Sequence, residues 1–162
     1  MVRTVGLAGN SHRMFREPGM LVFLVGLILF VGIHSIYIVA PGARDAAIAR
    51  IGYNPWRGIY SLVSLVGLVL VIYGYGLARQ DPVPLFEPPS WARDFAFVLM
   101  AVAVPLLVAS FFPVPTRIGR FVRHPMLMSV TLWSVAHALA IGTLAGVLLS
   151  AVFFIWTLAA RF

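Results

Sequence analysis

Residues 126–160 read MLMSVTLWSVAHALAIGTLAGVLLSAVFFIWTLAA and contain no aspartate, glutamate, lysine or arginine. As one helix this stretch would be roughly 50 Å long, whereas the hydrocarbon core of a bilayer is about 30 Å thick. In its middle, Gly142 can end one helix and Thr143 can cap the next. We therefore predict a hairpin of two short membrane helices that turns at Gly142-Thr143.

Three further stretches without charged residues are long enough to cross a bilayer, which takes about 20 apolar residues. They cover residues 19–40, 59–78 and 95–112. The predicted connections are a basic loop at 41–58, a proline-rich loop at 79–93 and a second basic loop at 113–125. Together with the hairpin, these stretches predict an all-α fold, an integral membrane bundle of about five transmembrane helices.

The composition of the chain is that of a membrane protein. It is 61% hydrophobic and only 10% charged, against roughly 25% charged residues in a soluble domain. All 12 basic residues are arginines, and they lie in short clusters between apolar runs. That spacing is typical of bilayer boundaries, so the predicted partner is the lipid bilayer and not nucleic acid. The absence of cysteine excludes disulfides, thiolate nucleophiles and iron–sulfur ligation.

The organisation along the chain is simple. Residues 1–17 are polar and basic, and we predict that they form an N-terminal extension to a single transmembrane helical domain at 18–162. Five spans place both basic loops and the C-terminus on one face, which then carries more of the arginines than the other face. Because arginine-rich loops tend to stay in the cytoplasm, this count favours an external N-terminus.

Two histidines lie inside predicted spans, His34 and His137. An ionisable side chain in hydrocarbon is costly and usually faces the bundle interior or a ligand. Antiparallel helices would place the two imidazoles at depths that differ by roughly 8 Å, a gap that a tilted, plate-like cofactor spans. Neutral imidazoles without nearby carboxylates suit haem or another soft metal centre better than Mg²⁺ or Ca²⁺. We predict that both are metal ligands; the alternative is that they are structural histidines.

A second group of candidates lies just before the hairpin, where Arg120, Arg123 and His124 form a basic cluster. Such a cluster anchors lipid headgroups or binds an anionic group such as a cofactor propionate, a phosphate or a carboxylate. His124 and His137 lie about 220° apart around a helix, so they cannot share one helix face. We predict that the cluster binds the anionic part of a cofactor.

The start of the second span adds two weaker cofactor-binding candidates, Arg57 and Tyr60, which lie one helical turn apart at the membrane interface. Tyr60 also begins a stripe that recurs every seven residues and continues with Gly67 and Gly74. Small residues at such a spacing favour close contact between membrane helices. Packing therefore explains this stripe better than catalysis does.

Taken in order, several short segments of the chain resemble the NnrU family of small bacterial membrane proteins. They are GIHS at 32–35, RGIYSLVS at 57–64, YGYG at 73–76, RHPML at 123–127 and WSVAH at 133–137. The resemblance implies a protein of the bacterial inner membrane with a role in nitrite and nitric oxide metabolism, and hence in denitrification.

A related branch, the zeta-carotene isomerases, is similar to this chain in the same histidine motifs. That resemblance implies haem b held between His34 and His137, and isomerisation of a cis double bond in a hydrophobic polyene. The branch has a further histidine after its second helix, where this chain has YGLAR at 75–79.

The Arg-His-Pro element at 123–125 is also similar to one in integral membrane methyltransferases that act on isoprenylcysteine or phospholipids. Those enzymes place acidic residues nearer the C-terminus, around S-adenosylmethionine, whereas no acidic residue follows Asp94 here. The favoured hypothesis is a membrane protein that binds haem b. It is either an enzyme acting on a lipophilic small molecule or a haem-holding accessory or sensor. The isomerase and the methyltransferase are the alternative functions.

Overall fold

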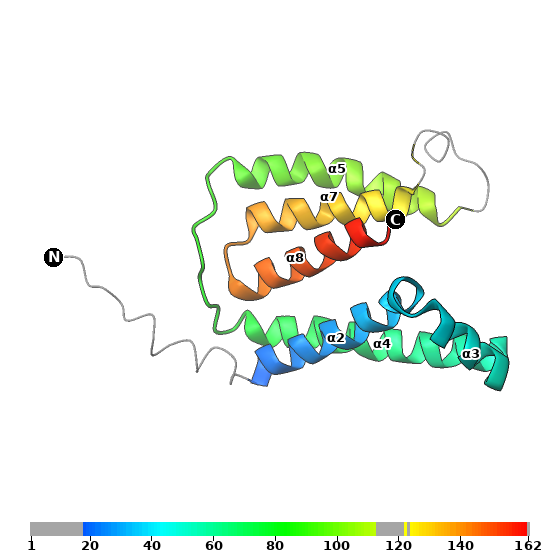
Figure 1. The fold of residues 1–162 in the computed structure, drawn as a ribbon. Coiled ribbons are helices and arrows are strands. Elements are labelled where there is room, and N and C mark those ends of the chain that lie inside the picture. The colour runs from blue at the N-terminus through cyan, green and yellow to red at the C-terminus, as the bar shows by residue number, and fades with distance from the viewer. Residues whose placement is uncertain (1–17, 113–121, 123, 162) are drawn as a thin grey trace. The chain divides into compact units, whose positions relative to one another are not determined.

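The computed structural model describes residues 18–112, 122 and 124–161. This part of the chain is helical, with one isolated β-bridge and no strand (Figure 1). The helices are α2 (Pro18–Val39), α3 (Pro41–Ile51), α4 (Tyr53–Ala78), α5 (Ala92–Ser110), α7 (Pro125–Ala140) and α8 (Leu144–Ala159). The predicted all-α fold is confirmed.

Three of these helices, α2, α4 and α5, are long and apolar enough to cross a membrane, and α7 and α8 are shorter apolar helices. Large apolar side chains cover their outer surfaces; Ile28, Leu62 and Ile72 are 72%, 63% and 64% exposed. Exposing an apolar surface of this extent to water is unfavourable, so this surface faces lipid. The chain is an integral membrane protein.

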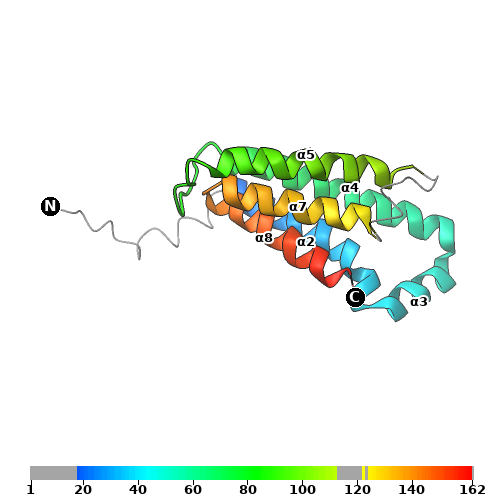
Figure 2. The ribbon, with the colours of Figure 1, turned by 90° about the horizontal axis from the view of Figure 1, so that it is seen from above.

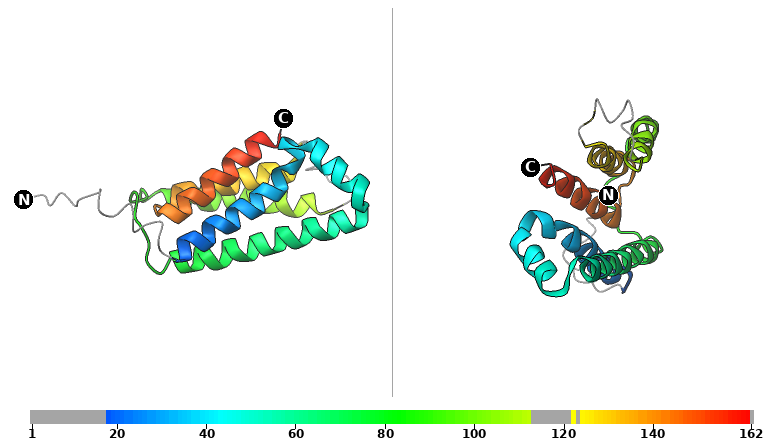
Figure 3. Two further views of the ribbon diagram at one scale, coloured as in Figure 1. Left: turned by 60° about the horizontal axis from the view of Figure 1, so that its bottom comes forward. Right: turned by 90° about the vertical axis from the view of Figure 1, so that its right-hand side faces the viewer.

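The chain divides into two compact units, Met1–Val83 and Pro84–Phe162. In the first unit, α2 and α4 pack antiparallel along their length (Figure 3). A Cβ added at Gly67 would lie 2.7 Å from the backbone nitrogen of Phe30, and one added at Gly74 would collide with the backbone of Phe23. The predicted glycine stripe is therefore confirmed as the contact face of α4.

The prediction of a first basic loop at 41–58 is wrong for most of these residues. Residues 41–51 form α3, and α4 begins at Tyr53 rather than at residue 59. Pro41 occupies the first turn of α3, where a missing N–H costs nothing, and the alanines that follow favour a helix. Only Gly52, with φ +87°, interrupts the helical backbone.

In the second unit, α5 packs on α7 and α7 packs on α8 (Figure 2). The predicted hairpin is confirmed, because α7 ends at Ala140, α8 begins at Leu144, and the Thr143 hydroxyl accepts a hydrogen bond from the Gly146 N–H at 3.4 Å. The proline-rich loop is also confirmed, except that its last two predicted residues, 92 and 93, belong to α5.

Hydrogen bonds between elements hold this unit together. The Leu85 N–H donates to the Gly142 carbonyl at 2.8 Å, which fastens the proline-rich loop to the hairpin turn. The Ser129 hydroxyl donates to the Ala103 carbonyl at 2.7 Å and so joins α7 to α5. The N-terminal extension and nearly all of the second predicted basic loop lie outside the described residues.

Candidate functional site

His34 in α2 and His137 in α7 have the same local geometry. The Nδ1 atom of His34 lies 2.7 Å from the Phe30 carbonyl oxygen, and that of His137 lies 2.9 Å from the Trp133 carbonyl oxygen. The aromatic ring four residues earlier stacks on the imidazole in both cases. The ring centroids are 4.4 Å apart in the first pair and 4.3 Å apart in the second, with interplanar angles of 34° and 36°.

This geometry fixes the tautomer of each neutral imidazole. A carbonyl oxygen only accepts hydrogen bonds, so Nδ1 must carry the hydrogen and Nε2 must carry the lone pair. Metal-binding histidines are held in the same way, by an N–H donated to a carbonyl or carboxylate, which orients the ring and makes the other nitrogen more basic. Both histidines therefore present Nε2 as a potential metal ligand.

Of the two cofactor-binding residues predicted in α4, Tyr60 lies beside His34, whereas Arg57 contacts another side chain. The ring of Tyr60 in α4 lies 5.5 Å from the imidazole, centroid to centroid. Arg57 lies one turn earlier in α4 and is exposed, with its guanidinium 5.7 Å from the centre of the Tyr53 ring. Tyr60 therefore belongs to the surroundings of His34, whereas the arginine contacts a different aromatic residue.

A cation that the sequence analysis did not single out lies at the end of this aromatic group. The guanidinium of Arg44 in α3 lies 4.5 Å from the centre of the Tyr37 ring, and the Tyr37 ring is in turn 6.5 Å from that of Tyr60. Arg44 also forms an ion pair with Asp45 at 2.7 Å. The Tyr37 hydroxyl and then Asp45 raise the pKa of Arg44, although partial desolvation opposes the shift.

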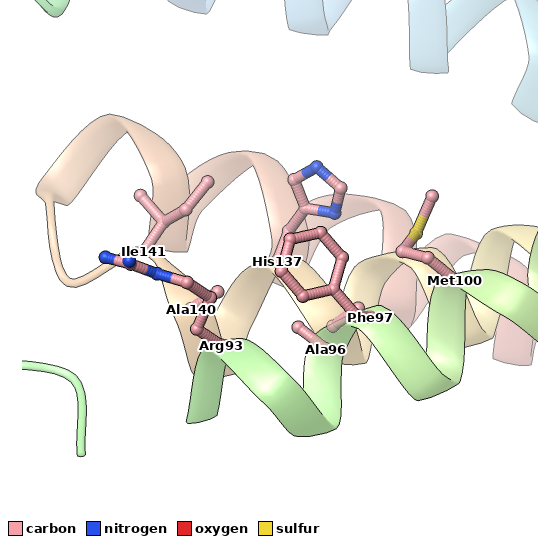
Figure 4. Close-up of a pocket in the computed structure, with 8 residues that line it drawn as sticks. Arg93, Ala96, Phe97, Met100, His137, Ala140 and Ile141 are labelled. Atoms are coloured by element: carbon pink, nitrogen blue, oxygen red, sulfur yellow. The ribbon is translucent and has the colours of Figure 1, made fainter. Parts of the chain in front are cut away.

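His137 lines a cavity of about 180 Å³ between α5 and α7 (Figure 4). The other lining residues are Arg93, Ala96, Phe97, Met100, Ala136, Ala140 and Ile141. Apart from the imidazole and the guanidinium of Arg93, the side chains in this lining are apolar. Drug-sized ligands occupy pockets of roughly 300–1,000 Å³, so this cavity fits part of a larger apolar ligand.

Of the predicted basic cluster, the structure describes His124 alone, at the other end of α7. His124 is the exposed N-cap of α7, whereas His137 lies in its last turn, and thirteen residues of helix separate them by about 20 Å. Arg120 and Arg123 lie outside the described residues. Since His34 and His137 belong to different units, their pairing on one metal stays a prediction.

A family model described as NnrU protein matches residues 22–162. The chain belongs to the NnrU family. No curated protein and no solved structure matches it. The match contains both membrane histidines of this NnrU chain, His34 and His137, and begins after the polar N-terminal extension.

Sequence analysis missed the aromatic partners and the cavity residues, although both leave a signal in the sequence. Phe30 and Trp133 each precede a histidine by four residues, the spacing that stacks side chains on one helix face. Arg93, Phe97 and Met100 recur at the spacing of a single helix face. The predicted loop at 79–93 included Arg93, so this face of α5 was missed.

Proposed function

We propose that this NnrU protein holds haem b within the membrane, with His34 and His137 as the residues that would bind its iron, and acts in nitrite and nitric oxide metabolism. The observation that carries the proposal is the aromatic–histidine geometry shared by the two units. Two intramembrane imidazoles, each with Nδ1 held by a carbonyl and one ring face covered by an aromatic side chain, present the same atom for coordination.

The number of available ligands also favours a porphyrin over a bare ion. A bound zinc ion needs three or four protein ligands. Among the described residues, no three histidine, cysteine or acidic side chains lie together so that they could hold a metal ion. A porphyrin brings nitrogen ligands of its own, so one or two histidines would suffice to hold it. When bound, haem supplies one-electron redox chemistry or activation of a small ligand.

The protein's own residues would orient this group and keep water away from it. Trp133 and Phe30 restrict rotation of the two imidazoles. On the side of His137, Phe97 and Met100 provide an apolar wall, which lowers the local dielectric constant and limits access of solvent. The proposed role in nitrite and nitric oxide metabolism rests on membership of the NnrU family. Deleting the gene in a denitrifying host tests this role, with the rates of nitrite and nitric oxide consumption as the measurement.

An absorption spectrum of the detergent-purified protein tests the haem proposal directly. Wild-type protein produced with supplied haem should show a low-spin spectrum with a sharp α band on reduction. His34→Ala and His137→Ala should each abolish or shift that band, whereas the matched control His124→Ala should remain low-spin. A colourless wild-type protein would show that the two histidines are structural. Loss of haem in the His124 variant alone would show that the ligand pair is wrong.

A further inference from the structure

The cavity that contains His137 has one permanently charged residue in its lining, Arg93. It lies in the first turn of α5, and Ala96, Phe97 and Met100 follow it on the same helix face. In Figure 4 the Arg93 side chain extends along the cavity toward Ile141, away from Met100, and the Phe97 ring lies beside the imidazole. The cavity is therefore amphipathic, with a cation at one end and an apolar wall beyond it.

The guanidinium has no partner in the described part of the chain. Within that part, Arg93 forms no salt bridge and no side-chain hydrogen bond. The neighbouring Asp94 does not line the cavity. Arginine binds carboxylates through two parallel hydrogen bonds, and the N-terminal end of α5 adds a partial positive charge at the same place. An anionic group on a bound ligand suits this end of the cavity.

We propose that Arg93 binds a carboxylate of the ligand whose apolar body lies against His137, so that this carboxylate faces the surface where α5 begins and α7 ends. This inference rests on the proposed haem function, since haem b combines a flat apolar ring with propionate carboxylates. Sequence analysis expected the anionic groups beside Arg120, Arg123 and His124. His124, however, lies at the opposite end of α7 from His137.

Arg93 is exposed, which sets the size of the expected effect. An exposed ion pair contributes little to the free energy of binding, and one with good bidentate geometry contributes somewhat more. Arg93→Gln should therefore release haem about two- to fivefold faster than wild type. Arg93→Lys keeps the charge but not the planar geometry, so its release rate should fall between those of wild type and Arg93→Gln.

The test measures transfer of haem from the full-length protein in detergent to excess apomyoglobin. Arg79→Gln is the matched control, because Arg79 is an exposed arginine that does not line the cavity. Each protein is also loaded with the dimethyl ester of haem b, which has no carboxylate. If Arg93 binds a propionate, wild type and Arg93→Gln should release the ester at the same rate.

Other outcomes separate this inference from the proposed function. If Arg93→Gln releases the ester faster by the same factor as haem, the arginine acts through packing and the inference is wrong. A wild-type release rate in Arg93→Gln, with faster release only from Arg120→Gln/Arg123→Gln, would place the carboxylates at the basic cluster and leave the haem function intact. A wild-type protein that takes up no haem would overturn both.

Discussion

The indole ring of Trp133 lies over the imidazole of His137, with ring centroids 4.3 Å apart, and the Trp133 carbonyl oxygen is 2.9 Å from Nδ1 of the same histidine. One residue thus fixes both the tautomer and the plane of the proposed ligand. The carbonyl belongs to the backbone and survives any substitution, so the contribution of the ring can be measured separately.

Replacing the ring should weaken haem binding without removing the ligand. Aromatic contacts of this kind contribute about 0.5–1.5 kcal/mol beyond area burial, so Trp133→Leu should raise the haem dissociation constant about two- to tenfold. Trp133→Phe keeps a stacking ring and should retain most of the affinity. Trp91→Leu alters an exposed tryptophan outside the cavity and serves as the control. Equal affinities for Trp133→Leu and wild type would show that the stacking does not orient the ligand.

The packing of α2 against α4 predicts opposite effects for two glycines of one helix. A methyl group at Gly74 would collide with the backbone of Phe23, whereas nothing lies within 4 Å of a Cβ added at Gly76. Gly74→Ala should lower the free energy of unfolding by about 1–3 kcal/mol, because the backbone of α2 cannot move away without disturbing the helix packing. Gly76→Ala should be neutral or stabilise by up to about 1 kcal/mol, through helix propensity.

Unfolding of the two variants in mixed detergent micelles, followed by circular dichroism, measures both effects. The difference between them is more informative than either value, because both substitutions add one methyl group to α4. Similar unfolding midpoints for the two variants would contradict the close approach of the two helices at Gly74.

These two glycines also show what the sequence could predict of the fold. The recurrence of Gly67 and Gly74 identified the contact face of α4, because only packing requires small residues at that spacing. The turn at Gly142-Thr143 was predictable because one helix could not fit the bilayer. Helix α3 was not, because arginines such as Arg44 and Arg50 occur in surface loops and interfacial helices alike, and composition does not separate the two.

The candidate site was predictable only in part, for a similar reason. An intramembrane histidine stands out by its desolvation cost, which is why His34 and His137 were recognised. Arg93 lies in the first turn of a membrane helix, where a charged side chain still reaches water. Its sequence context therefore resembles a loop, and only the packing of α5 on α7 places it in a cavity with His137.

The contact between the proline-rich loop and the hairpin turn predicts which positions share a membrane surface. The Leu85 N–H donates to the Gly142 carbonyl, so the loop and the turn meet at one face. Single cysteines at Glu87 and Thr143 should react with a membrane-impermeant maleimide from the same side of sealed vesicles. Gly32→Cys, within the apolar part of α2, should label poorly from either side. Labelling of Glu87→Cys and Thr143→Cys from opposite sides would refute the hairpin topology.

The pairing of His34 with His137 can be tested without any haem. Metal–imidazole bonds are about 2 Å long, so two histidines that bind one metal ion must have their Nε2 atoms within about 4 Å of each other. Cysteines that replace both histidines should then be joined by a short bifunctional maleimide, seen as a shift in electrophoretic mobility after cleavage of an engineered site in loop 79–91. The matched control pairs His34→Cys with His124→Cys. That second cysteine lies at the start of α7, about 20 Å from position 137, so the reagent should not join the control pair. Cross-linking of the control pair but not of the ligand pair would show that the histidines do not share one metal. Haem coordination would then rest on His137 and the residues of its own cavity.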